Sequence, residues 1–290
     1  MPHPGWAAFI FDGIGTRWEI STPDRMGDGQ QRRLLDIVEE YDAAWSRFRS
    51  DSRVAAAARQ PGCYELPESA AELGRLFQTL YRLSGGAMTP LIGGSLEQLG
   101  YDAAYSLRPR GAALPPPRWE DVLEWDGALL STSAPAVIDI GAAGKGQLVD
   151  LLSAELTAQG LGCFFIDASG DMLNSGPEPV VIGLEHPYDP AQAIGTFELG
   201  PGALCASASN RRAWGDGLHH VLDGLTGAPV QTTVATWAAS SSAMVADALA
   251  TALFLVPGDQ LSEHFDFSWL KIFSDGSAEY SANFEGVLFE

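Results

Sequence analysis

This chain contains, at residues 136–150, the segment Ala-Val-Ile-Asp-Ile-Gly-Ala-Ala-Gly-Lys-Gly-Gln-Leu-Val-Asp. Its apolar first part predicts a buried strand over residues 136–140 that leads into a glycine-rich turn with Asp139 and Lys145. Such a turn lets backbone amides approach a pyrophosphate, and a lysine there adds positive charge. The turn lacks the full P-loop spacing, so by itself it is a weak phosphate signal, and Lys145 alone is more often a surface lysine.

A second informative segment is Ala246-Asp-Ala-Leu-Ala-Thr-Ala-Leu-Phe254. Asp247 and Thr251 are about one helical turn apart, so their oxygen atoms share one face of a helix. An acid, a hydroxyl and exposed backbone carbonyls are ligand types that Mg²⁺ accepts. The alternative is a solvated aspartate and a packing threonine, but the apolar neighbours indicate a buried helix, where an unpaired carboxylate is costly. A metal site beside a diphosphate site points to nucleotide chemistry.

The overall charge of the chain limits the classes of partner. The net charge is −20 and the sequence pI is near 4.4, which argues against binding nucleic acid or an anionic membrane surface through a general electrostatic field. No apolar run approaches the ~18 residues of a membrane span, and the N-terminus has no signal-peptide pattern. We therefore expect a protein without an integral membrane segment or a nucleic-acid partner.

Cysteine usage bears on the compartment. Cys63, Cys163 and Cys205 are odd in number and match no metal or redox spacing, and Cys163 lies in an apolar run typical of a core. Reduced cysteines in a cytoplasmic protein are the expectation.

Helical and strand patterns alternate along the chain. The 290 residues are 46% hydrophobic, enough for a real core, and include 32 glycines and 18 prolines, which indicate many turns. A strand pair around a glycine turn is expected over residues 6–20, and about four helices over residues 30–45, 68–84, 147–158 and 242–256. Further short strands are expected over 136–140, 180–184 and 218–223. This order predicts an α+β fold in one compact domain, residues 1–290, with two lobes.

Seven short motifs follow one another along the chain. They are Ile14-Gly15-Thr16, Phe48 to Ser52, Asp139 to Gly146 with Asp150, Ser169-Gly170-Asp171, Gly183 to Pro187, His220 to Asp223 with Thr226-Gly227, and Ala246 to Leu253. In this order they resemble the pattern of the ApbE family, the FAD:protein FMN transferases, over about residues 10–256. Each motif alone is weak, whereas seven in the right order are a strong signal.

Three departures from the family pattern fall on segments expected to touch the flavin. The loop Ala87-Met88-Thr89-Pro90-Leu91 has a threonine where the family has an acid. The dipeptide Gly224-Leu225 replaces a Pro-Arg, and residues 206–208 read Ala-Ser-Ala instead of Thr-Ser-Gly. These changes predict a divergent or specialised member.

The resemblance implies a role for each matching residue. It implies Mg²⁺ bound by Asp247, Thr251 and the backbone carbonyl of Ala142, and a base at His220. In a strand His219 and His220 face opposite sides, so at most one of the two is catalytic. For Phe48, stacking on a flavin or adenine and core packing are equally open. The residues implied in FAD binding are Ile14, Phe48, Ala87, Met88, Thr89, Asp139, Lys145 and Val221.

The function implied by the resemblance is transfer of FMN from FAD to a Ser or Thr of a partner protein, with Mg²⁺ bound and AMP released. Two alternatives remain at this point. The same site hydrolyses FAD to FMN and AMP if water replaces the acceptor hydroxyl, and a flavin-binding protein with impaired catalysis fits the departures.

Overall fold

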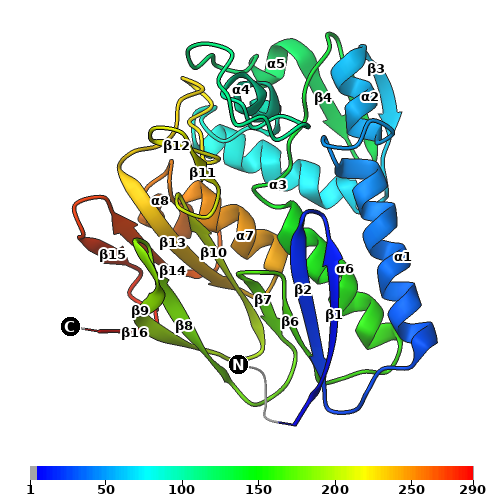
Figure 1. The fold of residues 1–290 in the computed structure, drawn as a ribbon, viewed down its shortest axis with the longest axis vertical. Coiled ribbons are helices and arrows are strands. Elements are labelled where there is room, and N and C mark those ends of the chain that lie inside the picture. Colours follow the sequence, from blue (N-terminus) through cyan, green and yellow to red (C-terminus); the bar gives the residue numbers. More distant parts are fainter. Residues whose placement is uncertain (1–4, 290) are drawn as a thin grey trace.

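A computed structural model describes residues 5–289, and its centre is a large antiparallel sheet (Figure 1). The first two strands form the predicted hairpin around Ile14 and Gly15, both with positive φ. All neighbours in the sheet pair antiparallel, as expected for an α+β fold. In spatial order the strands are β1 (Ala7–Gly13), β2 (Thr16–Thr22), β6 (Phe165–Asp167), β7 (Asp171–Asn174), β10 (Gly202–Ala208), β13 (Thr233–Ser240), β14 (Ser268–Phe273) and β15 (Ala278–Tyr280).

The large sheet is covered on both faces. Helix α7 (Ala243–Ala252) packs on β10 and β13, and α6 (Gly144–Ala158) packs on α7 and β7. The other face carries a small sheet of β8 (Val180–His186), β9 (Asp189–Leu199) and β16 (Val287–Leu288). Alternation along β10 fits this arrangement, because Ala203 and Cys205 join the helical core while Leu204 joins the core under the small sheet.

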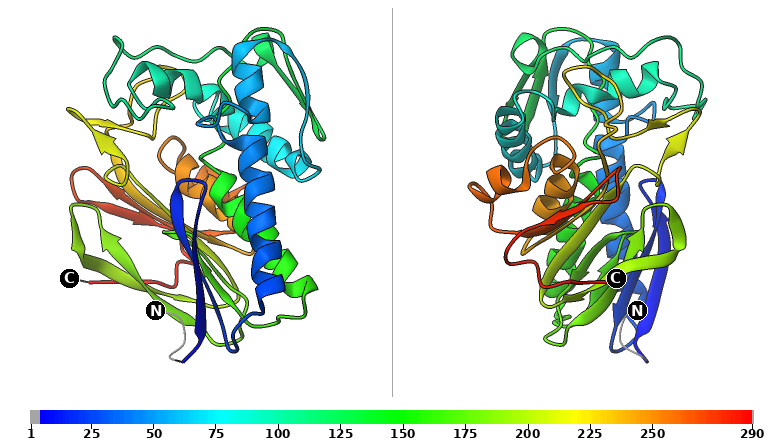
Figure 2. Two further views of the ribbon diagram at one scale, coloured as in Figure 1. Left: turned by 45° about the vertical axis from the view of Figure 1, so that its right-hand side comes forward. Right: turned by 90° about the vertical axis from the view of Figure 1, so that its left-hand side faces the viewer.

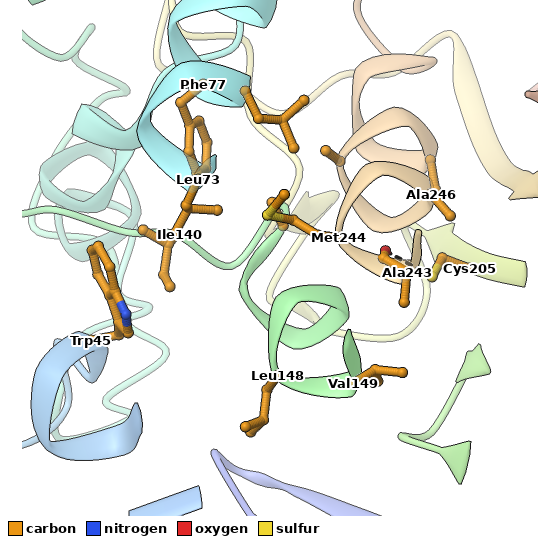
Figure 3. Close-up of a cluster of buried hydrophobic side chains, with 14 of the residues drawn as sticks. Trp45, Leu73, Phe77, Ile140, Leu148, Val149, Cys205, Ala243, Met244 and Ala246 are labelled. Carbon is orange, nitrogen blue, oxygen red and sulfur yellow. Dashed lines mark hydrogen bonds between the residues drawn. The ribbon is translucent and has the colours of Figure 1, made fainter. Parts of the chain in front are cut away.

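The helical core extends from α6 and α7 to the N-terminal helices. Helix α1 (Asp28–Trp45) runs along the outside of the β1–β2 hairpin, as the turned views in Figure 2 show. Helix α3 (Ala70–Leu83) places Leu73 and Phe77 against the core near Ile140 and Met244 (Figure 3). This layer also contains α2 (Arg53–Arg59), α5 (Trp119–Val122), α8 (Gly258–Ser262) and a sheet of β3 (Gly62–Glu65), β5 (Leu129–Thr132) and β4 (Leu123–Asp126).

A smaller cluster of buried apolar side chains joins two further segments of the chain. The turn η1 (Pro90–Ile92) continues into α4 (Gly93–Gln98), and β11 (Ala213–Trp214) pairs with β12 (Leu218–His219). Trp214 stacks on Tyr101 and donates a hydrogen bond from Nε1 to the Leu99 carbonyl at 2.9 Å. This contact ties the β11–β12 hairpin to the end of α4.

The contact between α6 and α7 is unusually close. A Cβ built on Gly146 would lie 2.7 Å from the Asp247 Cβ and overlap the Ala243 carbonyl, so only glycine fits. The Gly146 amide donates to Asp247 Oδ2 at 2.9 Å. Asp150 on α6 accepts hydrogen bonds from the Ser242 hydroxyl and the Ala243 and Met244 amides, and so caps α7.

The structure corrects several sequence predictions. Within residues 5–289 there are eight α-helices rather than about four, because α2, α4, α5 and α8 are only four to seven residues long and carry too few turns for a periodic signal. Residues 136–140 form no strand, since their amides bond to helical segments and not to a neighbouring strand: Ala136 donates to the Ala57 carbonyl in α2 and Asp139 to the Pro90 carbonyl in η1. Over 218–223 only Leu218–His219 is strand.

Two further comparisons concern the cysteines and the membrane. Cys163 is half-buried rather than in the core, whereas Cys205 is fully buried, and all three cysteines are free. Among the described residues, none of the helices combines the length and the apolar character that crossing a bilayer requires.

The α6–α7 contact yields a stability prediction. Gly146→Ala should lower the free energy of unfolding by about 1–3 kcal/mol, because the added methyl meets the Ala243 backbone and cannot be relieved by a side-chain movement. Gly29→Ala is the matched control, since its Cβ meets nothing within 4 Å in α1 and should raise stability by about 0.5–1 kcal/mol. Urea unfolding measures both, and equal stability of Gly146→Ala and wild type would contradict the close approach.

Candidate active site

A cavity of about 700 Å³ lies between the helical layer and the sheets, and most of the predicted site residues line it. The N-terminal turn of α6 contributes Ala142 and Lys145, and α7 contributes Asp247 and Thr251. Segments 87–89 and 220–222 form further parts of the wall. All the predicted site residues except Ile14 and Phe48 are in the lining: Ala87, Met88, Thr89, Asp139, Ala142, Lys145, His220, Val221, Asp247 and Thr251.

Ile14 and Phe48 lie beside the cavity rather than in its lining. Ile14 is in the left-handed region, with φ 43°, in the β1–β2 turn directly before the lining residue Gly15. The Phe48 ring stacks on Tyr105 with ring centroids 5.1 Å apart, and the Arg47 guanidinium lies 4.2 Å from its centroid. Of the two interpretations of Phe48, the structure favours packing within an aromatic cluster.

One end of the cavity holds a cluster of buried charges. Lys145 Nζ lies 2.9 Å from Asp171 Oδ2, while Asp171 Oδ1 makes no hydrogen bond. Burial, and then the nearby Asp171 charge, raise the pKa of Asp247 well above its usual value. Burial acts to lower the pKa of the Lys145 ammonium group, but the charges of Asp171 and Asp247 outweigh it, so that pKa is raised. Two carboxyl groups, both buried, therefore lie beside one ammonium group.

This end has the oxygen donors that a hard cation requires. Asp247 accepts one hydrogen bond, from the Gly146 amide, and Thr251 shares a 3.3 Å contact with the Ser207 hydroxyl. Ala142, in the glycine-rich turn before α6, also lines the cavity. Over residues 5–289 no group of three or more His, Cys, Asp or Glu is arranged to bind a metal. A cation held here would use one carboxylate, a hydroxyl and backbone oxygen, a donor set suited to Mg²⁺ rather than Zn²⁺.

At the other end, Asp139 is held by a buried arginine. Arg47 Nε donates to Asp139 Oδ2 at 2.5 Å, and the Gly141 amide donates to Oδ1 at 2.7 Å. Burial works to raise the pKa of Asp139, but the charge and hydrogen bond of Arg47 outweigh it, and the pKa falls below its usual value. Asp139 is therefore an ionised acceptor fixed at the cavity wall.

The two adjacent histidines have different surroundings. His219 is buried, with Nε2 2.9 Å from the Val230 carbonyl, and its Nδ1 accepts from the Val221 amide at 3.3 Å. His220 lines the cavity, and its buried Nδ1 has no hydrogen-bond partner among the described residues. Burial, followed by the charge of Arg212, lowers the pKa of His220 to about 3. These surroundings favour the neutral imidazole in the unliganded site, because the ring is desolvated beside a cation.

Two of the three departures from the family pattern, at Thr89 and at Gly224-Leu225, lie next to one another in the structure. Thr89 caps η1, accepting from the Leu91 amide at 3.2 Å. The Gly224 amide donates to the Ala87 carbonyl at 2.8 Å, and a Cβ on Gly224 would lie 2.9 Å from the Thr89 methyl. The altered loop around Met88 and the altered turn at Gly224 therefore form one packed wall.

Several lining or supporting residues were not found from sequence. Tyr101, Asn210 and Arg212 line the cavity, and Arg47 holds Asp139 from behind. The only sequence feature that pointed to any of them was the adjacent pair Arg211-Arg212 in an otherwise acidic chain. The Arg47–Asp139 pair joins residues far apart in sequence, which no local pattern reveals.

Comparisons with known proteins agree with this geometry. The model of the ApbE family matches residues 14–267. An FAD:protein FMN transferase of Rhodobacter capsulatus is 29% identical over 229 residues, 72% of this chain and 42% of that relative. One of Vibrio cholerae is 25% identical over 265 residues, 84% of this chain and 79% of the relative. This chain thus spans less than half the length of the Rhodobacter relative.

A solved structure shares the fold. The crystal structure of the ApbE protein of Thermotoga maritima superposes with a TM-score of 0.81 at 22% identity, covering 96% of this chain and 97% of that one. The predicted resemblance and the α+β fold class are confirmed.

The buried Arg47–Asp139 pair gives a pH-dependent prediction. Arg47→Met should lower the free energy of unfolding at pH 7 by about 3–5 kcal/mol, because it leaves a buried, unpaired carboxylate. In wild type the lowered pKa of Asp139 keeps this contribution until the pH falls through that pKa. In the variant Asp139 can protonate at mildly acidic pH, so the difference from wild type should shrink between pH 7 and pH 4.

Urea unfolding at both pH values measures the effect. Arg33→Met, which removes a half-exposed arginine from longer ion pairs, should change stability little at either pH. A deficit for Arg47→Met that stayed constant with pH would show that lost packing, not the Asp139 charge, is responsible.

Proposed function

This chain belongs to the ApbE family, and we propose on that premise that it is a transferase that moves FMN from FAD to a Ser or Thr hydroxyl of a partner protein. The observation that carries the proposal is the cavity itself, because residues from six of the seven family motifs line this one space of about 700 Å³. That volume is in the range of ligand pockets that enclose a molecule of drug size or larger.

The reaction is an in-line substitution at phosphorus. The acceptor hydroxyl oxygen forms a bond to the phosphorus nearest the flavin, the bond from that phosphorus to the bridging oxygen breaks, and AMP leaves with the bridging oxygen. The hydroxyl proton passes to a base. His220 is the candidate, because it lines the cavity, its Nδ1 lacks a partner among the described residues, and its lowered pKa keeps it neutral at pH 7.

A pKa of about 3 makes His220 a weak base until an anion arrives. A phosphate group beside it would stabilise the protonated imidazole and raise its pKa toward the working range. Burial of the histidine thus favours proton transfer only when the dinucleotide is bound.

Mg²⁺ fits the part of the cavity that α7 and the turn before α6 form. Asp247 is buried with a single hydrogen bond from the protein, and Asp171 has an oxygen without one, which is costly unless a cation compensates. Asp247, Thr251 and the Ala142 carbonyl would hold the ion, which when bound supplies neutralising charge to the pyrophosphate. Lys145, ion-paired with Asp171, adds charge on the same side.

The runner-up function is flavin binding with little turnover, and two observations favour it. The low pKa of His220 makes it a weak base, and the cavity wall around Thr89 and Gly224 departs from the family pattern. FAD hydrolysis to FMN and AMP is the remaining alternative, since water entering the same cavity would replace the acceptor hydroxyl.

AMP release from FAD tests these functions. Purified protein with FAD, an acceptor peptide containing a Ser or Thr, and Mg²⁺ should release AMP and attach FMN to the peptide. AMP without labelled peptide would identify a hydrolase, and bound FAD without AMP at any Mg²⁺ concentration would identify a flavin binder.

Asp247→Asn should lower the rate of AMP release by at least about 10–100-fold, the range for loss of even an outer-shell partner of a metal. The amide keeps the size of the side chain but removes the charge that holds the cation. Asp36→Asn, on the exposed side of α1, is the control for loss of one negative charge and should leave the rate unchanged. Equal rates for Asp247→Asn and wild type at limiting Mg²⁺ would contradict the metal assignment.

His220→Gln should lower kcat by about 10²–10⁴-fold through loss of the base. Because the pKa of His220 in the free enzyme is about 3, the wild-type kcat/KM should show no inflection from this group between pH 5 and pH 8. Rates of AMP release across that range check both expectations. An inflection near pH 6.5 that disappears in His220→Gln would show that the imidazole is solvated in the free enzyme.

A further inference from the structure

Three cationic side chains line the cavity, and they differ in their partners. Lys145 Nζ lies 2.9 Å from Asp171, and Arg211 Nη2 lies 2.8 Å from Glu185. Arg212 makes no ion pair anywhere in residues 5–289. Arg212 is exposed and therefore offers the cavity a guanidinium that no carboxylate of the described residues engages.

The backbone that carries Arg212 is anchored on both sides. Before it, Asn210 Nδ2 donates to the Pro187 carbonyl at 2.7 Å, and Arg211 pairs with Glu185, so the segment is fixed to the β8–β9 hairpin. After it, Trp214 is fixed to the Leu99 carbonyl. The neighbouring anchors fix the backbone of this segment, while the Arg212 guanidinium has no carboxylate partner among the described residues and can meet a ligand in the cavity.

The local charge around Arg212 is positive. Asp139 is ion-paired with Arg47 at 2.5 Å, and the charge of Arg212 also acts on it. The charge of Arg212 acts on His220 as well. Arg212 therefore brings positive charge to the part of the cavity that holds Asp139 and His220, where an anionic group of a ligand would be stabilised.

We propose that Arg212 is a substrate-binding residue that donates hydrogen bonds to the pyrophosphate of the bound dinucleotide on the side facing His220. This assignment rests on the proposed function, because the pyrophosphate is that of FAD. A guanidinium presents paired donors that match two phosphate oxygens, which a lysine ammonium does not reproduce. The same contact brings negative charge next to His220, whose Nδ1 lacks a partner.

Binding of three flavins to Arg212→Gln tests the proposal by quenching of flavin fluorescence. The Kd for FAD should rise by about 10–100-fold, the range for loss of a hydrogen bond to a charged group, with FMN weakened as well if the contact reaches its phosphate. The Kd for riboflavin, which has no phosphate, should change by less than about threefold. Arg212→Lys should recover only part of the affinity for FAD. Arg32→Gln, exposed on α1, controls for loss of one positive charge and should match wild type.

The outcomes separate this proposal from the proposed function. Wild-type protein that binds neither FAD nor riboflavin would defeat the proposed function itself. Wild-type binding of FAD with an unchanged Kd in Arg212→Gln would overturn the assignment of Arg212 alone. An unchanged Kd for FAD together with a raised KM for the acceptor peptide would also overturn it, and would show that the guanidinium binds an acidic group of the partner protein. An equal loss of affinity for riboflavin would overturn it too, because riboflavin has no phosphate and the substitution would then have disturbed the cavity as a whole.

Discussion

The site depends on how closely α6 approaches α7. Gly146 removes the side chain that would keep the two helices apart, and its amide uses the space to bond with Asp247. Asp150, one turn further along α6, caps the N-terminus of α7 with three hydrogen bonds. As a result, the turn with Ala142 and Lys145 lies directly beside Asp247 and Thr251. Two segments that are distant in sequence become one half of the cavity because a glycine and an aspartate fix their separation.

The charged side chains of the cavity form two groups, and both bear on ligand binding. Beside α6 and α7, Lys145 is ion-paired with Asp171, and burial together with the Asp171 charge raises the pKa of Asp247, so this carboxyl favours its neutral form until a cation binds. In the second group Asp139 is ion-paired with Arg47, and Arg212 has no carboxylate partner among the described residues. A dinucleotide that brought a cation to Asp247 and phosphate oxygens to Arg212 would engage both groups at once.

Sequence patterns predicted the parts of this structure that depend on local periodicity or on a complete motif. The amphipathic helices α1 and α3 and the β1–β2 hairpin were found. The α6–α7 half of the site follows from two motifs. Helices of four to seven residues were missed, because tertiary packing and not periodicity selects them. Arg47, Tyr101 and Arg212 were also missed, since their roles arise from contacts between distant segments.

The altered wall between the loop at Met88 and the turn at Gly224 shows how such departures can be compatible with a working site. The family pattern has an acid at the position of Thr89 and an arginine at that of Leu225, and this chain lacks both. Leu225 Cδ2 lies 3.4 Å from the position of a Cβ on Gly86, and Gly224 lies against Thr89, so both changes fall where the two segments meet. Losing one negative and one positive charge there leaves the charge of the wall unchanged. Thr89 retains a structural role as the cap of η1, and Gly224 provides the space for its methyl group. The altered wall therefore keeps both its net charge and a close fit between its two segments.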